Sequence, residues 1–184
     1  MRQHRHVVRF ATALIRVAIG AGLVGACVAV RAQDIYGGGA IWRDEQSHAF
    51  RLDALRGRAT VLTMAYGACR RICSTSLRLM ENIQTLADAR GEALNFVVVG
   101  LDPAHDTPAD WAAFRDERKL GRATWHFLSG DDAATRALAE QLRIHYWRYD
   151  DHVMHDFRIV LLSPEGRVVR SIERFDAPLA SLLP

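Results

Sequence analysis

Two stretches of the chain are almost continuously apolar over the length of a strand. They cover residues 59–66 and 94–101, and such a run is typical of a strand buried on both faces. Shorter strand patterns occur at 49–52 and 125–128. These four segments predict strands of one sheet with a buried centre.

Two further apolar segments near the end of the chain predict a hairpin. They cover 157–162 and 167–172 and flank Ser163-Pro-Glu-Gly166. Proline at the second position and glycine at the fourth suit a type I turn, so the two strands are expected to be antiparallel.

Three segments between the strands have helical patterns. Thr107 and Pro108 are favourable residues for the beginning of a helix, and Asp131 is suited to cap another over 132–142. The first helix, after residue 66, is marked by apolar residues at helical spacing: Leu77, Met80, Ile83 and Leu86.

The order of these elements predicts the fold class. Strands that alternate with helices form parallel βαβ units, and a terminal hairpin adds antiparallel strands to the same sheet. We therefore expect an α/β fold, a thioredoxin-like mixed sheet flanked by helices, with a C-terminal antiparallel hairpin.

The first 32 residues have the pattern of an export signal. A basic stretch through Arg16 is followed by fourteen uncharged residues, 17–30, and Val30-Arg31-Ala32 offers a cleavage site before Gln33. Residues 33–44 contain Gly37-Gly-Gly39 and are expected to form a flexible lead-in. The folded domain is then expected over 45–184.

Two alternatives to cleavage stay open. Cys27 lies in a sequence that loosely resembles a lipidation site, and residues 10–30 would serve as a membrane tether if they were retained. Each alternative places the domain outside the cytoplasm, in the periplasm or on the outer face of the inner membrane.

The distribution of charge argues against a nucleic-acid partner. The chain has 24 basic and 21 acidic residues, a formal net charge of +3. Five of the arginines lie in the first 32 residues, and the remaining chain has 19 basic and 21 acidic residues. The basic character therefore belongs to the leader.

Cys69 and Cys73 form the motif with the clearest chemistry. They lie where a buried strand ends and a helix begins, which is where open α/β sheets place functional groups. The helix N-terminus, with Arg70 and Arg71, favours thiolates, which redox and metal chemistry both require. A small structural disulfide is the simplest alternative.

Copper(I) is a soft ion and can be held by two thiolates with one further donor. The segment 150–155 precedes the last hairpin and contains His152, Met154 and His155. We expect at least one of these side chains to lie near the sulfurs. Asp102, at the end of a buried strand, would either bond a ligand histidine or act as a turn residue.

Three motifs together resemble those of the Sco/SenC copper chaperones. They are the C-x3-C pair, the segment Gly100-Leu-Asp-Pro-Ala-His-Asp-Thr-Pro108 after the next strand, and a histidine nine residues before Pro164. The resemblance covers roughly residues 45–175.

The resemblance implies a thioredoxin-like domain that binds one copper ion through Cys69, Cys73 and His155. His152 lies three residues too early to match. It also implies a role in the assembly of the copper centre of cytochrome c oxidase. The partner would be the copper-site subunit of that enzyme or another copper carrier.

One departure from the family supports an alternative function. The family commonly has proline after each cysteine, whereas this chain has Arg70 and Ser74. The alternative is an extracytoplasmic thiol–disulfide oxidoreductase in which Cys69 attacks and Cys73 resolves the mixed disulfide. The absence of proline between Pro108 and Pro164 favours metal binding over a general reductase, because thioredoxins place a cis-proline opposite their cysteines.

Overall fold

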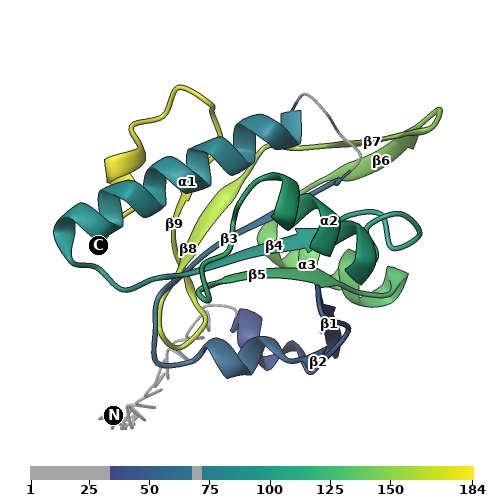
Figure 1. Ribbon diagram of the computed structural model, residues 1–184, viewed down its shortest axis with the longest axis horizontal. Helices are drawn as coiled ribbons and strands as arrows, with labels where there is room; N and C mark the ends of the chain where they lie inside the picture. Colours follow the sequence, from purple (N-terminus) through teal and green to yellow (C-terminus); the bar gives the residue numbers. More distant parts are fainter. Residues whose placement is uncertain (1–33, 68–71) are drawn as a thin grey trace, which may run out of the picture. The chain divides into compact units, whose positions relative to one another are not determined.

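The core of the protein is a seven-stranded sheet with the order β2-β1-β5-β4-β3-β8-β9 (Figure 1). The computed structural model describes residues 34–67 and 72–184. The strands of this sheet are β1 (Trp42–Asp44), β2 (Ala49–Phe50), β3 (Thr60–Ala65), β4 (Asn95–Gly100), β5 (Trp125–Ser129), β8 (Ile159–Leu162) and β9 (Val168–Ile172).

Strands β3, β4 and β5 form the parallel centre of the sheet. Val61 is paired with Phe96, which is in turn paired with Trp125. Every residue of β3 and β4 is buried, which explains why their sequences are almost continuously apolar. The prediction that these two strands are buried on both faces is confirmed.

The antiparallel strands lie on either side of this centre. β8 pairs with β3, and β9 pairs with β8. The turn between β8 and β9 is closed by a hydrogen bond of 2.9 Å from the Gly166 amide to the Ser163 carbonyl. Gly166 has φ of 89°, a conformation that glycine adopts without strain. The predicted C-terminal hairpin is confirmed.

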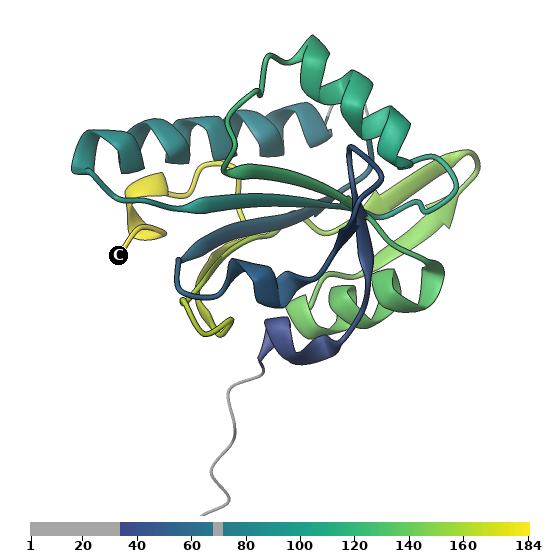
Figure 2. The ribbon, with the colours of Figure 1, turned by 60° about the horizontal axis from the view of Figure 1, so that its bottom comes forward.

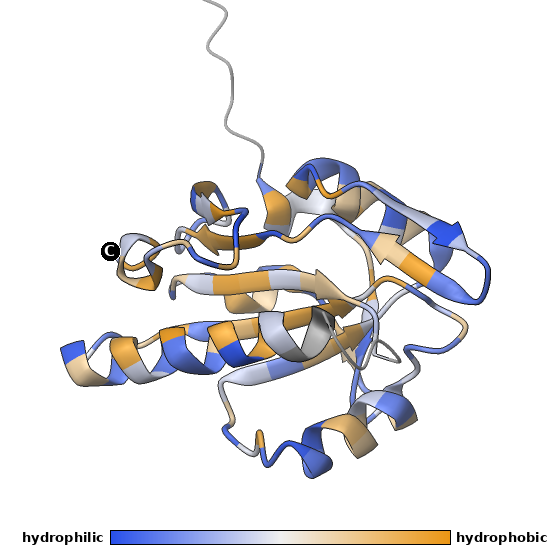
Figure 3. Ribbon diagram, turned by 90° about the horizontal axis from the view of Figure 1, so that it is seen from above, coloured by the Kyte–Doolittle hydropathy of each residue, from blue (hydrophilic) through white to orange (hydrophobic). Residues whose placement is uncertain are grey.

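Helices cover both faces of the sheet. α1 (Ile72–Arg90) and α2 (Pro108–Glu117) lie on one face and α3 (Asp132–Leu142) on the other (Figure 2). α2 begins with a capping box between Thr107 and Asp110. Asp131 accepts a hydrogen bond of 2.7 Å from the Ala134 amide and so caps α3. In Figure 3 the strands are largely orange, whereas α1 alternates between blue and orange, because one side of it faces solvent.

A separate two-stranded sheet was not expected from the sequence. β6 (Tyr146–Tyr149) and β7 (His152–His155) form an antiparallel hairpin. Asp150, in the turn between them, has φ of 50°, which aspartate tolerates better than most residues. The segment 150–155, expected as a loop, is therefore a turn and a strand.

Residues 34–44 differ from the flexible lead-in that their glycines predict. Ile35 and Tyr36 begin a short 3₁₀ helix, Ile35–Gly38, and are only 1% and 2% exposed. Trp42 lies in β1, inside the main sheet. The packed domain therefore begins before residue 45, because these apolar side chains complete its core.

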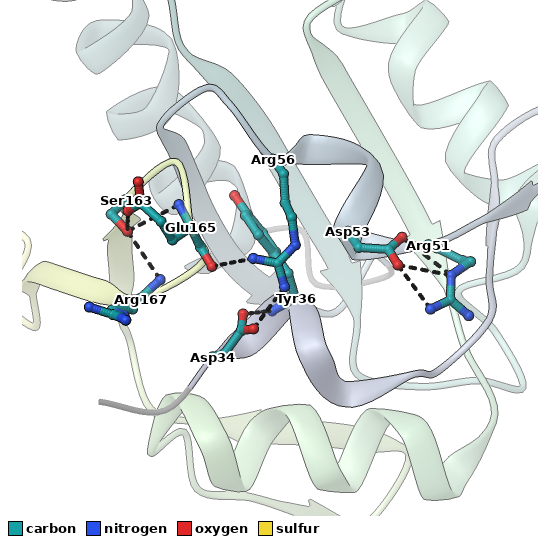
Figure 4. A network of polar contacts seen from close by, with 8 residues as sticks. All are labelled: Asp34, Tyr36, Arg51, Asp53, Arg56, Ser163, Glu165 and Arg167. Carbon is teal, nitrogen blue, oxygen red and sulfur yellow. Dashed lines mark hydrogen bonds and ion pairs between the residues drawn. The ribbon is translucent and has the colours of Figure 1, made fainter. Parts of the chain in front are cut away.

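A polar network fixes this segment to the turn between β8 and β9 (Figure 4). Arg56 pairs with Asp34 at 2.7 Å and donates a hydrogen bond of 2.6 Å to the Glu165 carbonyl. The hydrogen bond from Arg56 lowers the pKa of the Asp34 carboxyl. The Ile35 amide donates to the Gly166 carbonyl at 2.9 Å. Backbone and side-chain contacts thus both hold the segment in place.

Within residues 34–67 and 72–184, no helix has the length and apolar character needed to cross a membrane.

Two isoleucines six residues apart test whether the segment 34–44 is part of the folded domain. We predict that Ile35→Ala lowers the free energy of unfolding by about 2–4 kcal/mol, because it leaves a cavity in the core. Ile41 is 66% exposed, so Ile41→Ala should change it by less than about 0.5 kcal/mol. Urea unfolding of both variants measures the difference, and equal effects would contradict the packing described here.

Candidate metal centre

The two cysteines lie between the end of β3 and the first turn of α1. β3 ends at Ala65 and α1 begins at Ile72, so Cys73 lies in the first turn of that helix. Cys69, with Arg70 and Arg71, lies outside the described residues. The elements on either side of the motif, the end of β3 and the beginning of α1, lie where the sequence predicts them.

The β6–β7 hairpin is attached to the same edge of the sheet. Tyr66, which follows β3, donates a hydrogen bond of 3.4 Å from its hydroxyl to the Asp151 carbonyl at the tip of the hairpin. Arg148, on β6, donates one of 2.8 Å to the Asp102 carboxylate, which follows β4. Figures 1 and 2 both place the hairpin at the end of the sheet where α1 begins.

The hairpin separates its histidines onto opposite faces. Val153 is buried and His155 is half-buried, whereas His152 and Met154 are exposed. Because side chains alternate along a strand, Val153 and His155 share the inner face. Nδ1 of His155 lies 2.9 Å from the Asp156 carbonyl oxygen, and a carbonyl only accepts, so this contact requires the proton on Nδ1.

Asp102 connects the loop after β4 to strand β6 of the hairpin. Its side chain is 1% exposed, and its two oxygens lie 2.8 Å from Arg148 and 2.8 Å from His105. It also accepts a hydrogen bond of 3.3 Å from the Ala104 amide, as a turn residue does. Within the described residues, the histidine that Asp102 contacts is therefore His105 and not a histidine of the hairpin.

Asp106 joins the ends of three strands, and the sequence alone did not identify it. Its carboxylate accepts hydrogen bonds of 2.8 Å from the amides of Gly67, after β3, and Asp102, after β4. Its backbone carbonyl accepts one of 2.5 Å from Ser129, at the end of β5. A Cβ at Gly100 would lie 2.5 Å from the Asp106 Cβ, so this close approach requires glycine.

Burial raises the pKa of Asp106 to about 6, because desolvation disfavours the charged form. The two amide hydrogen bonds act in the opposite direction, and the negative charge of Asp102 adds to the increase. In the sequence, Asp106 stands directly before the Thr107 cap and within the segment Gly100–Pro108, but neither position indicates that its carboxylate is buried.

The described histidine, cysteine and carboxylate side chains do not gather into a metal site by themselves. Within residues 34–67 and 72–184, no group of three histidine, cysteine, aspartate or glutamate side chains is placed to hold a metal ion. His155 lies in this part of the chain. A site of three such side chains that includes His155 would need a ligand from outside the described residues.

Asp106 predicts a particular dependence of stability on pH. Its pKa is higher in the folded protein than the 3.8 of an exposed aspartate, so protonation stabilises the fold. This contribution is complete below about pH 4 and is lost as the pH rises through about 6. We predict that the destabilisation caused by Asp106→Asn decreases by about 3 kcal/mol over this range. Unfolding of both proteins between pH 4 and 7 measures it, and a difference independent of pH would contradict the assignment.

The chain matches one protein family over most of its length. The family model for SCO1/SenC matches residues 41–181. A relative from Stutzerimonas stutzeri is 28% identical over 130 residues, which are 67% of this chain and 62% of that protein. The chain thus spans about three fifths of the length of this curated relative.

Solved structures show the same fold. ScoI of Arabidopsis thaliana, solved with copper bound, is 22% identical with a TM-score of 0.70, and the match covers 80% of this chain and 92% of that one. BsSco, described as having a disulfide switch and as a member of the Sco family of cytochrome c oxidase assembly proteins, is 19% identical with a TM-score of 0.68. That match covers 78% of this chain and 86% of BsSco. The expectation of a thioredoxin-like fold is confirmed, and the chain belongs to the SCO1/SenC family.

Proposed function

We propose that this protein is an exported copper-binding chaperone. Cys69, Cys73 and His155 hold one copper ion, which the protein delivers to the copper centre of cytochrome c oxidase or to another copper carrier. The ion is cargo that the protein binds and releases. The leader of residues 1–32 directs the domain to the periplasm or to the outer face of the inner membrane.

The observation that carries this proposal is the attachment of the β6–β7 hairpin to the carboxyl edge of the sheet, where β3 ends and α1 begins. Tyr66 and Asp102 follow the neighbouring strands β3 and β4, and each holds one point of the hairpin. His155 lies on the inner face of this hairpin, and Cys73 lies at the beginning of α1, at the same end of the sheet. Segments about eighty residues apart in the sequence are thereby held at one edge.

The chemistry of these residues suits copper(I). Thiolates are soft ligands, and a third donor completes a three-coordinate site. The helix N-terminus at Cys73 stabilises negative charge. Because Nδ1 of His155 carries the proton, Nε2 is the nitrogen that would coordinate the ion.

The comparisons support the proposal from a different direction. A structural relative has been solved with copper bound, and another is described as belonging to a family of cytochrome c oxidase assembly proteins. Membership of the SCO1/SenC family makes a copper-binding role the first function to test.

A thiol–disulfide oxidoreductase is the second candidate function. Cys73 lies in the first turn of α1, and two arginines stand between the cysteines in the sequence. A helix N-terminus and nearby arginines favour thiolates. Cys69 would attack a disulfide of the partner, and Cys73 would displace the partner as a dithiol. The pair would then be left as a disulfide. This reaction requires the two sulfurs but no histidine.

The two histidines of β7 distinguish the candidates. We predict that His155→Ala weakens copper(I) binding by the reduced protein by at least about tenfold, because it removes a ligand. His152→Ala, on the outer face, should leave this first site unchanged. Anaerobic competition with a copper(I) chelator measures both affinities. Equal copper(I) affinities of the His155→Ala and His152→Ala variants would contradict the three-ligand site. Negligible copper binding together with rapid disulfide exchange in both variants would favour the oxidoreductase.

A further inference from the structure

The outer face of the β6–β7 hairpin carries a group of exposed aromatic and soft side chains. Trp147 is paired with Met154, and Tyr149 is paired with His152. Trp147 is 45% exposed, Met154 37% and Tyr149 67%. The ring of His145 lies 5.2 Å from that of Trp147. We call Trp147, Met154, His152 and His145 the outer cluster.

The exposure of this cluster contrasts with the rest of the domain. The three other tryptophans are at most 2% exposed, and Met64 and Met80 at most 1%. These are Trp42, Trp111 and Trp125. Trp147 and Met154 therefore do not serve the hydrophobic core, although the core is the usual place for both residue types.

We propose that the outer cluster is a second binding site for copper(I), in which the Met154 thioether and a His152 ring nitrogen coordinate the ion and the Trp147 indole covers it. Thioether and imidazole are both donors for copper(I). A cation over an indole ring is stabilised by the negative face of the ring.

The geometry of the strand supports this coordination. His152 and Met154 are two residues apart on β7, so their side chains leave the same face with Cα atoms about 7 Å apart. Trp147 is directly opposite Met154, where cross-strand side chains are within contact distance. Donors on either side of an ion can thus converge without any change in the backbone.

The His152 ring is available as a donor. Within the described part of the chain it takes part in no hydrogen bond or ion pair, and it is exposed. The contact between the rings of His145 and Trp147 restricts the orientation of the indole. Because His152 and Met154 are exposed, an ion can approach the cluster directly from solvent.

This site is distinct from the one proposed above. The outer cluster and His155 lie on opposite faces of the hairpin, so one ion cannot bind to both groups. The outer site needs none of the cysteines, and it stands or fails independently of the proposed function. Because its donors are exposed and neutral, we expect it to bind more weakly than two thiolates would.

The test uses the full chain with Cys27, Cys69 and Cys73 all replaced by serine. Copper(I) is titrated under anaerobic conditions against a chelator, and tryptophan fluorescence is recorded. We expect one ion to bind and to quench the fluorescence of Trp147, the exposed tryptophan. Absence of binding would overturn the proposal. It is the result expected if this face serves only to dock a protein.

Variants in the same background identify the donors. We expect Met154→Leu, which keeps the shape but removes the sulfur, and His152→Gln each to weaken binding at least tenfold. Trp147→Phe should remove most of the quenching. His48→Gln is the matched control, because His48 is also an exposed histidine but lies outside the hairpin, and it should bind as its parent does. Binding that Met154→Leu leaves unchanged would contradict the proposal.

Discussion

The ion pair between Asp102 and Arg148 is the interaction on which the arrangement of the site depends. Asp102 is buried at the end of β4, whereas Arg148 belongs to a hairpin outside the main sheet. A buried carboxylate is costly unless it is paired and hydrogen-bonded. Asp102 therefore keeps Arg148 close, and the hairpin is held over the ends of the parallel strands. The hydrogen bond from Tyr66 to the tip of the hairpin also holds the hairpin in this position.

Attachment at these points gives the hairpin one face toward the domain and one toward solvent. The inner face carries Val153 and His155 toward the domain, and the outer face carries Trp147 and Met154 toward solvent. A shift of one residue in the pairing of β6 and β7 would exchange the faces of one strand. The register of this short sheet thus determines which histidine lies on the inner face.

The sequence predicts the core better than the site, for physical reasons. β3 and β4 are buried on both faces, so their sequences are almost continuously apolar. The caps at Thr107 and Asp131 bond to residues three positions away, so the cap residues themselves indicate where each helix begins. The β6–β7 hairpin is half-exposed and rich in polar residues, so its pattern resembles that of a loop. Ile35 and Asp106 owe their roles to segments distant in the sequence, which no local pattern records. The assignment of His155 as a ligand rests on the resemblance to a family and stays a prediction, and the structure shows that His155 is half-buried on β7.

The most direct test of the attachment is the copper(I) affinity of an Arg148→Gln variant. Arg148 is not a proposed ligand, so this substitution affects the first copper site only through the position of the hairpin. We predict that anaerobic chelator competition finds binding about tenfold weaker in the reduced protein, as outer-shell substitutions commonly cause. Arg148→Lys, which keeps the charge, should recover part of the loss. An unchanged affinity in Arg148→Gln would contradict the claim that the ion pair with Asp102 positions His155.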